Sequence, residues 1–164
     1  MYKLALACLI LTASAITTLA QSQPRIGVGL ILGEPTGLSA KYWLSDAHAI
    51  DAAAAWSFDE NDAFQLHGDY LWHRYEWLMP KNIRGTLPVY FGIGARLKLQ
   101  DEGGPGDRHN QDENIFGIRV PLGVNYLPYN GPFDLFAELV PILNLAPDSD
   151  LAFSAALGAR LYFP

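Results

Sequence analysis

Three side chains that could bind a metal ion or exchange a proton lie close together in the sequence. His67, Asp69 and His73 are separated by even numbers of residues, so in a β-strand they point to the same face. Imidazole and carboxylate groups serve as metal ligands and as general acids and bases. They also form buried hydrogen-bond networks, because polar side chains need partners once they leave water. No ligand spacing typical of a zinc or calcium site surrounds them, so we expect a network, with no metal and no cofactor.

A second group of candidate ligands lies in residues 100–114. This stretch combines acids and amides with Gly103-Gly104-Pro105-Gly106, a composition typical of a solvated loop. We expect a loop in water rather than a cation site. Its charged and imidazole side chains are Asp107, Arg108, His109, Asp112 and Glu113.

The apolar residues of the segments that carry these side chains alternate with the period of a β-strand. From Arg25 onward, apolar side chains recur at every second position and not at the spacing of a helix. Turn-forming residues, such as Pro128-Tyr129-Asn130-Gly131, separate neighbouring segments. The sequence therefore predicts eight strands joined by local hairpins, which close into an up-and-down barrel because closure removes exposed edges. The predicted strands are residues 25–33, 36–44, 50–58, 64–73, 87–99, 116–126, 134–144 and 153–163.

The two faces of the predicted sheet differ in composition. One face is almost purely Leu, Ile, Val, Phe and Ala, whereas the other mixes Gly and Ser with scattered charges. A soluble lipocalin-like barrel would show water a face richer in charge and poorer in glycine. An outer-membrane barrel turns its apolar face to lipid and fills a narrow interior with small and polar side chains. Aromatic residues near the strand ends suit a membrane interface, so we predict an all-β, eight-stranded antiparallel transmembrane β-barrel.

Charged and polar side chains of the inward face form the candidate site. A charge buried without a partner is strongly disfavoured, so we expect a lumen network that braces the barrel. With Asp46 at the centre of the second turn, Lys41 lies directly opposite Asp51. The expected members of the network are Lys41, Asp51, His67, Asp69, Arg96, Arg119, Asp134, Glu138 and Arg160.

Three of these ions are expected to form one cluster that blocks the bore. If the sixth turn is centred near Tyr129, Arg119 lies opposite Glu138. Across the last hairpin, Arg160 falls diagonal to both Asp134 and Glu138, within reach of a long side chain. We therefore predict that Arg119, Glu138 and Arg160 meet inside the barrel.

The N-terminus has the layout of a secretory signal peptide. Lys3 precedes the apolar stretch Leu4–Leu11, and small residues then lead to Ala20, the expected cleavage site. The apolar stretch is shorter than the roughly 20 residues that a spanning helix needs. We expect residues 1–20 to be the signal peptide and residues 21–164 the outer-membrane β-barrel domain, which then has no cysteine because Cys8 is removed.

Composition sets limits on the class of protein. The length of 164 residues allows one domain. Half of the residues are hydrophobic and only 17% are charged, against about 25% in soluble domains, so the chain is not disordered. The net charge of −6 excludes a typical nucleic-acid-binding protein, which carries a basic face.

Several segments resemble a family of small uncharacterised bacterial outer-membrane β-barrel proteins, and more distantly the OmpA/OmpX-type eight-stranded barrels. The segments are residues 29–43, 67–73, 88–96 and 158–163. The resemblance implies an outer-membrane location and brings no catalytic residues. It also implies that the barrel-assembly machinery reads a C-terminal signal, here Leu157, Leu161 and Phe163, although Pro164 follows the aromatic and departs from that pattern.

These observations predict a small plugged barrel, a monomer in outer-membrane lipid with a structural or interaction role and no open pore. One alternative is a lipid A-modifying enzyme with a Ser/His pair at the rim, but Ser154 faces the lumen and His48 has no serine partner in its strand. A second alternative is a soluble lipid-binding barrel. An even strand count places residues 100–114 outside the cell, with Arg108 open to protease, and residues 74–85 in the periplasm.

Overall fold

The computed structural model describes residues 25–34, 36–57, 63–100, 113–147 and 149–163. For four of these, Ser57, Ala63, Gln100 and Glu113, it describes the backbone but not the side chain. The expected signal peptide, its Cys8, and most of the loop around Arg108, including the acid Asp112, lie outside the described residues. Within these residues no helix is long and apolar enough to cross a membrane, a finding that does not concern strands.

Eight segments of antiparallel strand make the wall of the molecule. Seven are single strands, and the sixth segment is divided into β7 (Glu113–Arg119) and β8 (Leu122–Pro128). The two-residue strand β5 (Gly85–Thr86) pairs with the end of β8. The single strands are β1 (Ile26–Gly33), β2 (Thr36–Trp43), β3 (His48–Ser57), β4 (Ala63–Arg74), β6 (Val89–Gln100), β9 (Phe133–Ala146) and β10 (Asp150–Phe163).

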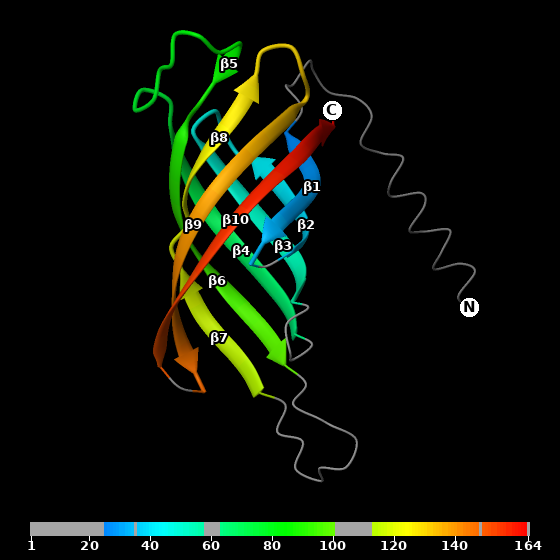
Figure 1. The fold of residues 1–164 in the computed structure, drawn as a ribbon, viewed down its shortest axis with the longest axis vertical. Coiled ribbons are helices and arrows are strands. Elements are labelled where there is room, and N and C mark those ends of the chain that lie inside the picture. Colours follow the sequence, from blue (N-terminus) through cyan, green and yellow to red (C-terminus); the bar gives the residue numbers. More distant parts are fainter. Residues whose placement is uncertain (1–24, 35, 58–62, 101–112, 148, 164) are drawn as a thin grey trace, which may run out of the picture.

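The eight segments form a closed ring. Each pairs with its neighbours in the sequence, and β10 pairs with both β9 and β1, which joins the last strand to the first. The predicted all-β, eight-stranded, up-and-down antiparallel barrel is therefore confirmed. In Figure 1, β1 begins and β10 ends at the same end of the barrel, which we call the terminal end, and the β4–β6 connection lies there too. At the opposite end, called the far end, β6 and β9 end and β7 and β10 begin.

The break between β7 and β8 falls at Val120 and Pro121. Proline has no N–H to donate to a neighbouring strand, but its carbonyl still accepts a hydrogen bond from Gly92 N (2.9 Å), and Val120 N donates to Pro141 O (3.0 Å). The register with β6 is unchanged across the break, so β7 and β8 act as one segment of the wall.

The hairpin after β8 corrects one predicted register. Leu122 pairs with Leu139, which places Arg119 opposite Ile142 and not opposite Glu138. The physical reason is the length of the turn. Prolines stand at 128 and 132, and the β8–β9 pairing ends at Tyr126, which moves the centre of the turn beyond Asn130. By contrast, Lys41 lies directly opposite Asp51, as predicted from the second turn.

Apolar side chains cover the outside of the barrel, and charged side chains fill the inside. Leu157 is 63% exposed, whereas its neighbour on the other face, Ala156, is buried. The largest fully buried side chains include Arg119, Arg160 and Lys41. A water-soluble domain has the reverse distribution. This distribution is that of a barrel that spans a membrane.

Two glycines make room for aromatic rings inside. A Cβ atom at Gly123 would overlap the Tyr90 ring, and one at Gly158 would overlap the Phe136 ring. Gly33 has a different role, since it ends β1 with a φ of 131°, a conformation that side-chain-bearing residues rarely adopt.

The ionic interior of the barrel

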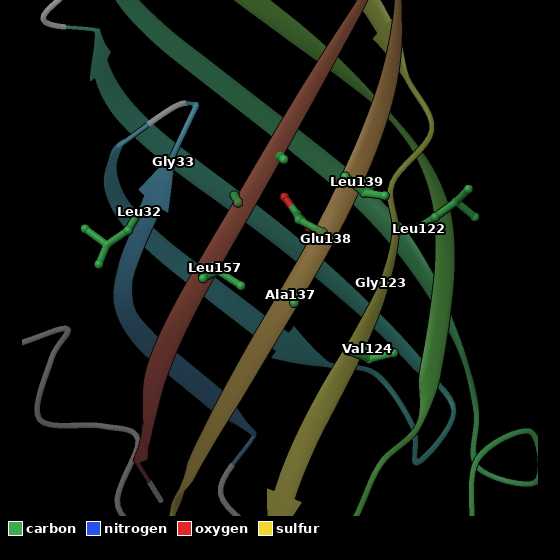
Figure 2. A pocket seen from close by; sticks show the side chains of 11 residues that line it. Leu32, Gly33, Leu122, Gly123, Val124, Ala137, Glu138, Leu139 and Leu157 are labelled. Carbon is green, nitrogen blue, oxygen red and sulfur yellow. The ribbon is translucent and has the colours of Figure 1, made fainter.

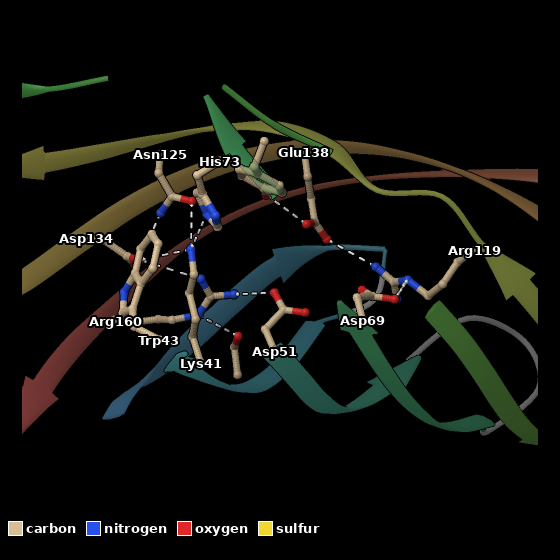
Figure 3. Close-up of polar contacts among 12 residues, drawn as sticks. Lys41, Trp43, Asp51, Asp69, His73, Arg119, Asn125, Asp134, Glu138 and Arg160 are labelled. Atoms are coloured by element: carbon tan, nitrogen blue, oxygen red, sulfur yellow. Dashed lines mark hydrogen bonds and ion pairs between the residues drawn. The ribbon is translucent and has the colours of Figure 1, made fainter. Parts of the chain in front are cut away.

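Lys41 connects opposite walls of the barrel. Its Nζ donates to Asn125 Oδ1 on β8 at 3.0 Å and lies 2.9 Å from His73 Nε2 on β4. Strand β8 belongs to the segment that lies four segments away from β2 in either direction around the ring of eight. The ammonium also lies over the Trp43 ring, 4.3 Å from its centroid, a favourable position for a cation. Figure 3 shows these side chains converging on Lys41.

Asp134 on β9 is the main acceptor near this lysine. Its Oδ2 receives hydrogen bonds from Asn125 Nδ2 (2.8 Å) and from Tyr162 Oη (2.7 Å). The same oxygen lies 3.6 Å from Arg160 Nη1 and 4.0 Å from Lys41 Nζ. Asp134 is completely buried, so these groups replace the water that its charge would otherwise require.

Arg160 joins β10 to β2 and β3. Its Nη2 donates to Asp51 Oδ2 at 3.0 Å, and its Nε donates to Ser39 Oγ at 2.9 Å. The guanidinium also lies 4.0 Å from the centroid of the Phe136 ring. Together with Lys41 and Asp134, these residues form what we call the terminal cluster, because it lies nearer the terminal end (Figure 3).

A second group, the central cluster, surrounds Arg119. Its Nε lies 3.0 Å from Asp69 Oδ1 on β4, and its Nη2 donates to Glu138 Oε1 on β9 at 3.3 Å. The other oxygen of Glu138 accepts a hydrogen bond from Tyr90 Oη at 2.9 Å. One arginine therefore links three segments of the wall, β4, β7 and β9.

Arg119 and Glu138 meet as predicted, but the prediction that Arg160 joins them in a single cluster is wrong. Arg160 lies directly opposite Asp134, whereas Glu138 pairs with Ala156, four residues away along β10. Because Glu138 and Arg160 lie at different levels of the β9–β10 ladder, they have different partners. Glu138 pairs with Arg119, and Arg160 pairs with Asp51. Arg160 is also not diagonal to Asp134 but level with it.

The remaining predicted members lie apart from both clusters. Arg96 Nη2 donates to Asn144 Oδ1 at 2.8 Å, and Asn144 Nδ2 donates to Asp150 Oδ1 at 2.7 Å, nearer the far end. His67 faces inward and is buried, with its Nδ1 3.5 Å from Gln65 Nε2. His67, Asp69 and His73 thus share one face of β4, but each contacts a different partner.

The charges of the predicted network balance in number. Its cations are Lys41, Arg96, Arg119 and Arg160, and its anions are Asp51, Asp69, Asp134 and Glu138. Apart from Arg96, each of these ions is buried and lies within 4.0 Å of an opposite charge. Paired burial is the condition under which charges are tolerated in a low-dielectric interior.

Several neutral side chains of the clusters were not among the predicted site residues. Each shares the inward parity of its strand, so the signal for them was the same alternation that identified the ions. What the sequence does not indicate is which of them meet across the bore. These residues are Ser39, Trp43, Tyr90, Asn125 and Tyr162.

The described residues hold no candidate metal site, and two residues considered for an enzyme lie apart. Among them, no group of three or more His, Cys, Asp and Glu side chains could hold a metal ion. His48 begins β3 at the terminal end and lies 3.0 Å from Tyr70 Oη, whereas Ser154 is on the part of β10 that approaches the far end. The Ser/His pair of the enzyme alternative is therefore not formed by these two residues.

The outer wall carries a shallow apolar hollow and the predicted C-terminal signal. The hollow, of 560 Å³, extends over β8, β9, β10 and the end of β1, with Leu32, Leu139 and Leu157 around it (Figure 2). Small side chains such as Ala137 in the centre produce the concavity. On β10, Leu157, Leu161 and Phe163 all face outward and are exposed.

The fold and its interior define the class of membrane-spanning β-barrels with an apolar exterior and an ionic core. Comparison of structures finds the same fold in the N-terminal β-barrel domain of Pseudomonas aeruginosa OprF, with a TM-score of 0.66 and 16% sequence identity over 87% of this chain and all of that domain. Neisserial surface protein A (NspA) is also found, at a TM-score of 0.47 and 14% identity over 84% of this chain and 93% of that one. No protein-family model and no curated protein sequence matches the chain.

Proposed function

We propose that this protein is a plugged outer-membrane barrel with a structural or interaction role and no open pore. The observation that carries the proposal is the hydrogen bond of 3.0 Å between Lys41 on β2 and Asn125 on β8. These two segments lie directly across the ring from each other, so the two side chains together span the full width of the bore. An eight-stranded barrel is only wide enough for side chains to fill its interior.

The central cluster supports the same conclusion at another level of the barrel. Arg119 contacts Asp69 and Glu138 from opposite sides, and Tyr90 fills the space beside Glu138. An ion that passed along the bore would have to separate two sets of paired, buried charges. Breaking such pairs leaves charges without partners, which is strongly unfavourable.

The outer membrane of a bacterium is the location that suits this barrel. The exterior is apolar on every segment, as outer-membrane barrels require, and the expected signal peptide, residues 1–20, accounts for export. In that membrane the terminal end faces the periplasm, and the β6–β7 connection lies outside the cell. Protease added to intact cells should then cut near Arg108.

The partners that we propose follow from this location. They are the outer-membrane lipid around the apolar wall and the barrel-assembly machinery, which would read Leu157, Leu161 and Phe163 during insertion. We propose a monomer that binds no nucleic acid and has no enzymatic activity. The fold that it shares with the OprF barrel domain is consistent with a role in the cell envelope.

Conductance in a planar lipid bilayer tests the proposal. The wild-type barrel should give no steady current at any applied voltage that the bilayer withstands. As a comparison, the Lys41→Ala/Arg160→Ala double variant removes two inward cations and should produce current steps if it remains folded. A steady wild-type conductance would show that the bore is open and would overturn the proposal.

A further inference from the structure

The connection between β4 and β6 exposes three consecutive large apolar side chains. Trp77 is 59% exposed, Leu78 40% and Met79 75%. They lie beyond the last residue of β4, Arg74, and so outside the ladder of hydrogen bonds. Exposed apolar side chains in succession indicate contact with something other than water.

This connection is fixed against the barrel at both of its ends. Tyr75 Oη donates to Asp46 O in the β2–β3 turn at 2.9 Å. At the other end, the Arg84 carbonyl accepts hydrogen bonds from Tyr129 N (3.2 Å) and Tyr126 Oη (3.3 Å). Burial, together with the Asp46 carboxylate, raises the pKa of Tyr75 to about 12, so its hydroxyl remains a donor at neutral pH.

Trp77 lies on the outer side of the wall. Its ring stacks on Phe91 of β6 with a centroid distance of 6.1 Å and an interplanar angle of 17°, and Phe91 stacks in turn on Trp72 of β4 at 5.7 Å and 18°. Both Phe91 and Trp72 belong to the apolar, outward parity of their strands. The three rings therefore form a continuous aromatic row from the wall to the connection, in the place where a membrane interface would lie.

Basic residues gather at this same end of the barrel. Arg74, Lys81 and Arg84 belong to the connection or its edge, and Arg25 reaches the β2–β3 turn, where its Nη1 donates to Leu44 O at 3.5 Å. All four are exposed. Two acids, Asp46 and Glu76, are exposed beside them. The excess of basic residues is notable in a chain whose net charge is −6.

The far end carries exposed acids. Of the described residues, Glu34 and Asp150 are exposed there. The sequences of the β3–β4 and β6–β7 connections are also rich in acids. In those two connections the acids are Asp59, Glu60, Asp62, Asp101, Glu102, Asp107 and Asp112, and Arg108 is basic. Among the described residues, the excess of exposed basic side chains therefore lies at the terminal end.

We propose that the terminal end is a binding site for anionic phospholipids. Arg74, Lys81 and Arg84 contact the head-group phosphates, while Trp77 and Met79 lie at the boundary between head groups and acyl chains. Aromatic side chains favour that boundary, and basic residues near an anionic surface are attracted to it. This inference rests on the proposed orientation, in which the terminal end meets the phospholipid leaflet.

The test compares two lipids around the folded full chain. The barrel is inserted into phosphatidylcholine vesicles that contain a fixed fraction of brominated phosphatidylglycerol or of brominated phosphatidylcholine, and quenching of tryptophan fluorescence gives the relative affinity. The difference between wild type and Trp77→Phe isolates the signal of Trp77. We expect phosphatidylglycerol to quench Trp77 more strongly, with a preference of about fivefold that falls as salt is added, since one basic residue near the surface contributes about this factor.

Charge variants identify the residues responsible. The Arg74→Gln/Lys81→Gln/Arg84→Gln variant should lose the preference, whereas Glu76→Gln, a matched change in the same connection, should keep or increase it. Circular dichroism confirms that each variant is folded, and the salt dependence of the wild type provides a second measurement that needs no variant. Equal quenching by the two lipids, or an unchanged preference in the triple variant, would overturn this inference alone. Failure of the wild type to insert into any vesicle would overturn the proposed membrane function and this inference with it.

Discussion

Arg160 and Asp51 form a buried ion pair with 3.0 Å between Nη2 and Oδ2, although 109 residues separate them in the chain. The pair connects the last strand of the barrel, β10, to the third, β3, across two intervening strands. The same guanidinium lies near Asp134 on β9. A single side chain therefore links strands on both sides of the seam between β10 and β1.

Removing this guanidinium should destabilise the barrel strongly. Arg160→Met leaves two carboxylates, Asp51 and Asp134, without their shared cation, and breaking a buried pair costs about 3–5 kcal/mol. Urea unfolding from phospholipid vesicles measures the change in the free energy of unfolding. The Arg160→Met/Asp51→Asn double variant should recover part of the loss, because it removes one of the stranded charges. A double variant that is less stable than Arg160→Met would contradict the pairing.

Glu138 provides a test of the central cluster. Glu138→Ala removes one of the two carboxylate partners of Arg119 and the acceptor of Tyr90, so we expect a loss of about 3–5 kcal/mol in the free energy of unfolding. Glu76 is an exposed acid at the terminal end and is the matched control, since Glu76→Ala should have little effect. Equal, mild effects of the two substitutions in the same unfolding assay would show that Glu138 does not face inward.

The fit between Gly123 and Tyr90 gives a prediction about space rather than charge. A Cβ atom at Gly123 would overlap the Tyr90 ring, so Gly123→Ala should destabilise the barrel by about 1–3 kcal/mol through overpacking. In the Gly123→Ala/Tyr90→Ala double variant the overlap with the ring is gone and only the approach to Ala137 O, 2.5 Å from the added Cβ, remains, so the cost of Gly123→Ala should become smaller. A double-mutant cycle measures this coupling. Additive effects of the two substitutions would mean that the ring and the glycine are not in contact.

The strands and their faces could be predicted from the sequence because the signal is local. Alternation at every second residue is present within each segment, and it placed Leu157 outside and Arg160 inside without knowledge of any other strand. The partner of Lys41 in the second hairpin was also predictable. Only a few residues separate β2 from β3, so the centre of their turn is well defined.

The contacts across the bore could not be predicted in the same way. Arg119 lies opposite Ile142 and not opposite Glu138, because prolines on both sides of the sixth turn end the ladder early and move the centre of the hairpin. Its side chain contacts Glu138 all the same. Lys41 meets Asn125 only because the ring places β8 across from β2. Such contacts depend on the register of every hairpin between the two strands, and an error in one turn changes them all.

The central claim is that the apolar face of the barrel contacts lipid and the ionic face is enclosed. Leu157 lies on the outer wall near the middle of β10 and is 63% exposed, so its environment separates a wall that faces lipid from a wall that faces water. The free energy of unfolding from phospholipid vesicles should be measured for Leu157→Arg and Leu157→Ala. Leu157→Arg should lower it by about 2–4 kcal/mol, as expected for arginine near the bilayer midplane, and by far more than Leu157→Ala. Equal effects of the two substitutions would contradict the claim, because a side chain in water would tolerate arginine as well as alanine.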